Sequence, residues 1–378
     1  MNPILKVDKN TYHSQPFYIK ATVLLVGFYL LISMLSIAQD IIVPIIFAVM
    51  IAVLLHPFVN FFERLKINRV VAIIFTLFLT FMITFAIAFL IFRQLSEFGK
   101  SWPILVDKFT LMLNESTKWI SRYFDLSQWK VQQWILKAKT DALSFSNDQV
   151  GQTLFVLGNW IVVMLLVPVY VFILLFYKKL LIEFIHRAFV SQDQKQVSRI
   201  ISETKTVIHK YLTGLIIEAF IVAGLNITVL LFLGIEYPIL LGILGALLNV
   251  IPYIGGLVAV ALPMMVALAT KTTSLYALYV LIFYYIIQLI DNNVIVPLIV
   301  SSKVKINALF AIIVVIAGNA LWGVSGMFLS IPLLAVIKVI FDHIDSLKPW
   351  GFLLGDSLPD KPLDVLPVIK KIKAKILK

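Results

Sequence analysis

The chain has 378 residues, of which 61% are hydrophobic and only 14% are charged, and its formal net charge is +12. A soluble domain has about 45–50% apolar and about 25% charged residues, so this composition excludes an ordinary soluble protein and indicates a membrane protein. The lysines and arginines cluster beside the apolar runs, as they do in the cytoplasmic loops of membrane proteins. We therefore expect a membrane partner and no nucleic acid. Cysteine is absent, which excludes disulfides.

The apolar runs are continuous and repeatedly about 20 residues long, which is enough for a helix to cross a hydrocarbon core of about 30 Å. Strands of a membrane barrel would instead alternate polar and apolar residues. We predict an all-α, polytopic transmembrane helical protein with about six full spans plus two broken or re-entrant hairpins, which makes eight spans in the conventional count.

The N-terminal half divides by charge and aromatic content. Residues 1–92 are predicted to hold spans 1 to 3, and the basic loop at 63–69 places that loop and the N-terminus in the cytoplasm. Residues 93–150 mix charges of both signs with tryptophans, which indicates an extracytoplasmic amphipathic helical hairpin at the headgroup level. Residues 151–177 are then span 4.

The rest of the chain carries a cytoplasmic segment, a core and a tail. Residues 178–212 are basic and amphipathic, residues 213–345 are the predicted transport core, and residues 346–378 form a basic cytoplasmic tail. We predict that the end of this tail is an amphipathic helix on the inner leaflet, with a disordered tail as the alternative. The lysines expected to contact anionic lipids are Lys370, Lys371, Lys373, Lys375 and Lys378.

Two segments of the core, 238–270 and 306–340, are longer than the about 20 residues that one span needs. Helix breakers interrupt both: NVIPYIGG at 249–256 and GNALWGVSG at 318–326. Such breaks survive in a membrane only where protein or a watery cavity satisfies the freed backbone, and paired breaks indicate a transporter's binding site. Tilted spans would place Lys271 inside. Re-entrant hairpins would place it outside, and the charge pattern favours these.

The sequence QLIDNNVIVPLIV places an acid within an apolar segment. A carboxylate at the bilayer centre costs about 2.5–3.5 kcal/mol on insertion scales, so Asp291 is expected to face the protein interior and to be functional. Gln288 and Asn292 share its stripe on an α-helix. Pro297 would free the carbonyl of Asn293.

These oxygen atoms suit a proton or a small cation, with a possible sodium site at Asp291, Asn292 and Asn293. The alternative is that Asp291 pins a broken helix through hydrogen bonds. Glu218 is a second acid within a span, with a hydrogen bond to a partner helix as its structural alternative. The other candidate substrate or ion ligands offer amides, hydroxyls or bare backbone: Asn226, Asn249, Pro252, Tyr253, Gly255, Gly256, Asn319 and Ser325.

The segment NVIPYIGGLVAVALP and the stretch from QLIDNN to LLAVIKVI resemble the autoinducer-2 exporter family of bacterial membrane proteins, and the similarity covers essentially the whole chain. The resemblance implies about eight spans, a homo-oligomer, and either export of small polar signals or sodium/proton antiport. It also implies the bacterial inner (cytoplasmic) membrane, and the charge pattern places both termini in the cytoplasm. No cofactor is expected beyond a coupling H⁺ or Na⁺.

The sequence leaves one preferred function and three alternatives. We predict a secondary active transporter that exports a small polar organic solute, such as an autoinducer-2-like signal, driven by a proton or sodium gradient. The alternatives are a cation/proton antiporter without an organic substrate, a passive pore, and an intramembrane protease suggested by the G-x-S-G motif ending at Gly326 and the histidine of HPFVN. Serine catalysis needs a base within hydrogen-bond reach, and no suitable histidine follows Ser325, so we expect no enzyme.

Overall fold

A computed structural model describes residues 16–124, 133–137, 139–140, 166–189, 193–250, 255–300 and 306–356. Every regular element in these residues is helical, and six of the helices are long and apolar enough to cross a membrane. The prediction of an all-α polytopic membrane protein is therefore confirmed. Predictions on the end of the basic tail and on residues 1–15 lie outside the described residues.

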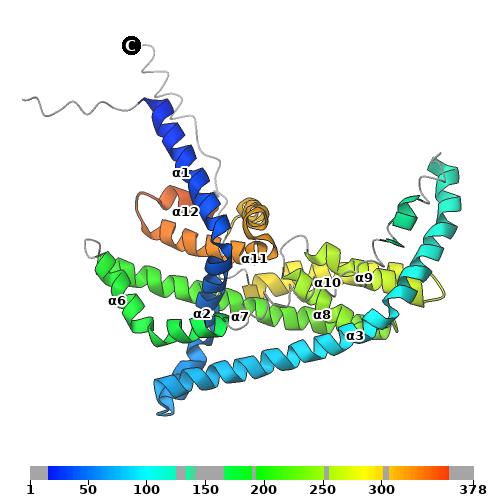
Figure 1. Ribbon diagram of the computed structural model, residues 1–378, viewed down its shortest axis with the longest axis horizontal. Helices are drawn as coiled ribbons and strands as arrows, with labels where there is room; N and C mark the ends of the chain where they lie inside the picture. Colours follow the sequence, from blue (N-terminus) through cyan, green and yellow to red (C-terminus); the bar gives the residue numbers. More distant parts are fainter. Residues whose placement is uncertain are drawn as a thin grey trace, which may run out of the picture.

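The first three helices are α1 (Phe17–Ile37), α2 (Gln39–Arg64) and α3 (Arg69–Phe124). α1 has no buried residue and projects from the body of the molecule (Figure 1). α3 has 56 residues and is therefore about 84 Å long, so it continues without a break past residue 92, where the third span was expected to end. An ion pair between Lys139 Nζ and Asp107 Oδ1 at 2.8 Å shows that the chain returns alongside α3.

α6 (Lys178–Ala188) and α7 (Gln194–Phe232) follow. Asp193 caps α7, because its Oδ1 accepts a hydrogen bond from the backbone N–H of Lys195 at 2.9 Å. With 39 residues, α7 is about 58 Å long and joins the basic amphipathic segment to the following apolar segment as one rod. It runs through the middle of the molecule, with α2, α6 and α11 packed along it and α8 and α10 beside its second half (Figure 1).

The first broken segment folds as a helical hairpin. α8 (Pro238–Asn249) has 12 residues and α9 (Gly255–Thr270) has 16, so they are about 18 Å and about 24 Å long. Neither reaches across a hydrocarbon core of about 30 Å. The two helices pack against each other, and α8 also packs against α7, where Gly242 allows the backbone of Ile227 to approach closely.

The second broken segment is α11 (Ala308–His343), which is interrupted at its centre. Trp322 and Gly323 have non-helical backbone angles, and the φ of Gly323 is +61°, in the left-handed region that glycine adopts without steric cost. The breaker motif therefore ends one helical arm and begins another.

The two arms of α11 fold back on each other. Ser330 Oγ donates a hydrogen bond to the carbonyl oxygen of Val314 at 2.8 Å, although 16 residues of straight helix would separate them by about 24 Å. The arms touch at Gly318 and Gly326, where a Cβ on Gly326 would collide with the carbonyl oxygen of Gly318. The short α12 (Lys348–Leu354) then packs on α11.

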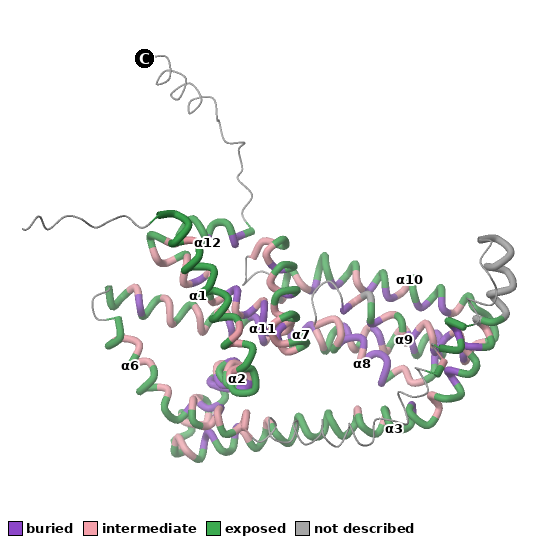
Figure 2. Tube along the Cα trace, turned by 45° about the horizontal axis from the view of Figure 1, so that its top comes forward, coloured by how far each residue is buried: buried purple, intermediate pink, exposed green. Residues whose placement is uncertain are grey.

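α10 (Leu275–Ile290) continues into η1 (Asp291–Val300), a ten-residue π-helix. The main core lies where α7, α8, α9 and α10 meet, and buried residues are concentrated there, whereas most of α1 and α3 is exposed (Figure 2). Fully buried side chains in this core are Leu230, Leu240, Leu241, Val266 and Val280. A rigid core thus holds one face of the first hairpin.

The α8–α9 hairpin yields a topology prediction, because its two ends must emerge on the same face of the membrane. The chain has no cysteine, so E236C and T272C each create a single thiol, and both positions are exposed. We expect a membrane-impermeant maleimide to label both from outside intact cells, with K195C as the cytoplasmic control. Labelling of positions 236 and 272 from opposite sides would show that the segment crosses the membrane.

Candidate functional site

Asp291 lies at the point where α10 changes into the π-helix η1, and its side chain is only 2% exposed. Asn249, the last residue of α8, donates a hydrogen bond from Nδ2 to Asp291 Oδ2 at 2.8 Å. The other carboxylate oxygen, Oδ1, is buried without a hydrogen-bond partner among the described residues. One oxygen of the carboxylate is thus held by the first break, and the other has a free capacity to accept a hydrogen bond or a cation.

Two glycines allow the first break to pack tightly around Asn249, the hydrogen-bond partner of this carboxylate. A Cβ atom at Gly255 would collide with the carbonyl oxygen of Leu248, so the first turn of α9 rests directly on the end of α8. A Cβ at Gly256 would collide with the Gln288 carboxamide and would lie 3.3 Å from Asn249 Oδ1. The structure therefore brings together Asn249, both glycines, Gln288 and Asp291, as the sequence suggested.

The two asparagines after Asp291 have other partners. Asn293 donates from Nδ2 to the carbonyl oxygen of Leu289 at 2.8 Å, and Asn292 Oδ1 accepts from Gln288 Nε2 at 3.4 Å. Both asparagines are exposed, whereas Asp291 is buried. The predicted shell assumed an α-helical register, but a π-helix bonds residue i to i+5 and turns these side chains elsewhere. In that register Pro297 removes the donor to the carbonyl of Asn292 rather than that of Asn293.

Glu218 supplies a second buried acid. It is 6% exposed on α7, which packs against η1, the element that begins at Asp291. Farther along α7, Asn226 is 2% exposed, and its Oδ1 has no hydrogen-bond partner among the residues described. Three of the predicted candidates therefore lie on two elements that pack against each other. Glu218 and Asn226 are on α7, and Asp291 begins η1.

Tyr284 is a polar residue that the list of candidate ligands missed. Its hydroxyl is buried, and within the described part of the chain it has no hydrogen-bond partner. A Cβ at Gly245 would lie 3.0 Å from Asn226 Nδ2 and 3.7 Å from the Tyr284 hydroxyl, so this glycine of α8 faces both groups. The tyrosine lies on the same helical stripe as Gln288, which was the available signal. Unpartnered buried groups are costly, so water or a ligand is expected beside them.

The second break approaches the first through apolar contacts. Val250 and Trp322 both pack against one buried cluster that includes Leu212, Leu215 and Leu329. Trp322 also donates from Nε1 to the carbonyl oxygen of Leu35 on α1 at 3.0 Å.

The polar candidates of the second break are not joined to Asp291. Asn319 is exposed and Ser325 is half-buried, and neither makes a hydrogen bond to Asp291 in the described structure. Pro252 and Tyr253 lie outside the described residues.

The histidine of the proposed protease pair has other partners. His56 contacts the Lys178 ammonium through Nε2, and Asn60 Nδ2 lies 3.4 Å from its Nδ1. No hydrogen bond to Ser325 is formed in the described structure. Within the same residues, no group of three or more His, Asp or Glu side chains could hold a metal ion.

The described residues hold six helices long enough to cross a membrane, two broken hairpins and a buried acid bonded to the first hairpin, which are the features of a membrane transporter or permease. Residues 19–346 match the family described as AI-2E family transporter. The chain therefore belongs to this family, and the resemblance drawn from its sequence is confirmed.

Individual relatives carry transport names. AI-2 transport protein TqsA of Escherichia coli (strain K12) is 24% identical over 347 residues, which are 89% of this chain and 96% of that protein. YrrI of Bacillus subtilis (strain 168), a proposed transport protein, is 28% identical over 153 residues, 40% of this chain and 42% of YrrI. PerM of Escherichia coli (strain K12), a proposed permease, is 28% identical over 184 residues, 47% of this chain and 50% of PerM. The matches to YrrI and PerM thus span half or less of those proteins.

The contact at Gly255 leads to a stability prediction. G255A places a methyl group against the Leu248 backbone, and such overpacking costs about 1–3 kcal/mol. G224A is the matched control, because nothing lies within 4 Å of its added Cβ and alanine favours a helix by about 1 kcal/mol over glycine. We expect thermal unfolding in detergent to shift downward for G255A only. Equal melting temperatures for G255A and G224A would show that Gly255 does not pack tightly against the Leu248 backbone.

Proposed function

We propose that this protein is a secondary active transporter of the bacterial inner membrane that exports a small polar organic solute in exchange for protons or sodium ions. The observation that carries the proposal is the half-satisfied Asp291 carboxylate, which is bonded to Asn249 on one oxygen and unpartnered on the other. Intramembrane acids in transporters serve as ion or proton sites, because burial without a function is costly.

Proton or ion exchange at Asp291 follows from its surroundings. A dry environment favours the neutral carboxylic acid, and a bound cation or water favours the carboxylate. Alternating exposure of the α8–α9 break to the two sides of the membrane would therefore load and release a proton or Na⁺ at the same group. Because Asn249 belongs to the hairpin and Asp291 to η1, a movement between them alters the shell of the acid directly.

The polar groups at the site favour a solute that carries hydroxyl groups. Carboxylates, amides and a tyrosine hydroxyl all pair with hydroxyls, whereas two neighbouring acids repel an anion. The relative TqsA is named as an AI-2 transport protein. We therefore propose an autoinducer-2-like solute as the substrate.

A cation/proton antiporter without an organic substrate is the second candidate. It is favoured by the presence of two buried acids, Glu218 on α7 and Asp291 at the start of η1, on elements that pack against each other. Both candidates require the same carboxylate, and they differ in whether an organic solute moves.

The first test removes the charge of Asp291. D291N retains the shape and an oxygen that accepts from Asn249, so folding and membrane level should change little. Gradient-driven uptake of autoinducer-2 into inside-out vesicles should fall to the level of empty vesicles. D107N is the control, because Asp107 forms an ion pair on α3, on another part of the chain.

E218Q should reduce uptake less than D291N if Glu218 only joins helices. Normal D291N transport with its ion dependence intact would make this acid structural.

A second test separates a transporter from a passive pore. Purified protein in vesicles should accumulate the solute above its external concentration while an imposed proton or sodium gradient lasts, and lose it when an ionophore collapses the gradient. Ion exchange measured with a pH-sensitive dye, without solute movement, would favour the antiporter. Downhill solute flux that ignores the ion gradient would show that the chain forms a pore.

A further inference from the structure

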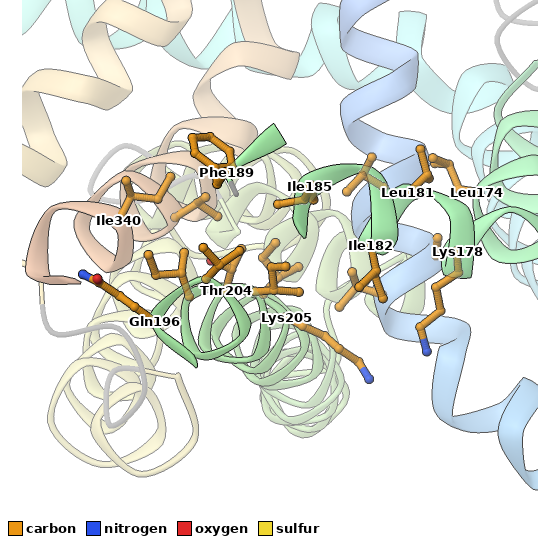
Figure 3. Close-up of a pocket in the computed structure, with 18 of the residues that line it drawn as sticks. Leu174, Lys178, Leu181, Ile182, Ile185, Phe189, Gln196, Thr204, Lys205 and Ile340 are labelled. Atoms are coloured by element: carbon orange, nitrogen blue, oxygen red, sulfur yellow. The ribbon is translucent and has the colours of Figure 1, made fainter. Parts of the chain in front are cut away.

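A cavity of about 980 Å³ lies away from the Asp291 site, between α2, α6, α7 and the end of α11. One face of α6 lines it along the whole helix, through Lys178, Leu181, Ile182, Ile185 and the following Phe189 (Figure 3). α6 has 11 residues and is about 16 Å long, so the cavity is elongated along it. Its walls are mostly aliphatic, which suits a hydrocarbon chain and does not suit the polar solute proposed for the transport site.

One end of this cavity is strongly basic. Lys178 and Lys205 extend their ammonium groups on the same side of it (Figure 3), and His56 contacts Lys178 there. In the described part of the chain neither lysine forms an ion pair, whereas the nearby Arg69 is paired with Glu63 at 3.7 Å. Burial lowers the pKa of the Lys178 ammonium, and repulsion by Lys205 and Arg69 lowers it further. An anion at this end would offset the repulsion between these cations.

The opposite end of the cavity offers no unpaired positive charge among the residues that line it. Gln196 lies there (Figure 3), and Asp345, the one acidic residue among those that line the cavity, is paired with Lys348 at 2.6 Å. A ligand with one anionic end and one long apolar part would therefore bind in a single orientation.

We propose that this cavity binds an acidic phospholipid of the cytoplasmic leaflet, with an acyl chain along α6 and the phosphate between Lys178 and Lys205. The charge pattern of the sequence places this basic segment on the cytoplasmic side, where acidic phospholipids attract lysines. The lipid would join α6 to α2, α7 and α11. This binding is independent of the proposed transport activity, because it requires no residue of the Asp291 site.

Titration of the purified full-length chain with lipids, followed by native mass spectrometry, tests the proposal. The probes are dipalmitoyl phosphatidylglycerol, dipalmitoyl phosphatidylcholine and glycerol 3-phosphate. We expect phosphatidylglycerol to bind at least about tenfold more tightly than phosphatidylcholine, and glycerol 3-phosphate not to compete. K178Q/K205Q should remove this preference. K195Q/K210Q, which changes two exposed lysines of α7 outside the cavity, should retain it.

A cavity-filling variant and a cross-link test the acyl-chain position. T204F fills the cavity beside Lys205 and should weaken binding of both phospholipids. A phosphatidylglycerol with a diazirine near the end of its acyl chain should label α6 or α7 residues such as Ile185 and Ile201 in the unmodified protein.

Four outcomes would overturn the proposal. Equal loss of binding in K195Q/K210Q would indicate nonspecific surface charge, and competition by glycerol 3-phosphate would indicate a site for small polar anions. Labels found only outside the cavity would place the lipid elsewhere. Lipid binding that occurs only after removal of residues 357–378 would show that the tail is the occupant.

Discussion

The buried carboxylate of Asp291 is the constraint on which the arrangement of its neighbours depends. Its side chain is only 2% exposed and accepts one hydrogen bond. A charge or an unpaired polar group in an apolar medium is costly, so the acid persists only if protein atoms, water or a bound ion complete its shell. Asn249 supplies part of that shell from the end of a broken helix. The missing side chain of Gly256 leaves room for the Gln288 carboxamide on the Asn249 side of the site. The open half of the shell is the place where an ion or a proton can act.

The broken helices explain how such a shell can change. A continuous helix satisfies its own backbone and offers few polar atoms, whereas the α8–α9 hairpin presents the Asn249 carboxamide to Asp291. α7 connects this region to the basic segment around α6 as one uninterrupted rod of 39 residues. The second hairpin in α11 reaches the same region through Trp322 and an apolar cluster. A movement of either hairpin relative to α7 would therefore alter the surroundings of both buried acids.

Much of this arrangement was predictable from the sequence, and the failures have physical causes. Continuous apolar runs predicted the helices, and glycine and proline near residues 249–256 and 318–326 predicted the breaks. The shell of Asp291 was only partly predicted, because the chain changes to a π-helix at this residue and a 3.6-residue period cannot represent that change. The packing of α7, which carries Glu218, against η1 and the cavity lined by α6 both join segments far apart in the chain, so local patterns could not reveal them.

Chemical modification of Asp291 tests the central claim most directly. Carbodiimides react with protonated carboxyl groups in apolar surroundings, and mass spectrometry of the purified protein can locate the adduct. An acid that exchanges a proton or Na⁺ should be modified at low pH without sodium, and should be protected as pH rises or as Na⁺ is added. Modification of Asp291 that is unaffected by pH, sodium and solute, or no modification at all, would contradict the account and leave the acid with a purely structural role.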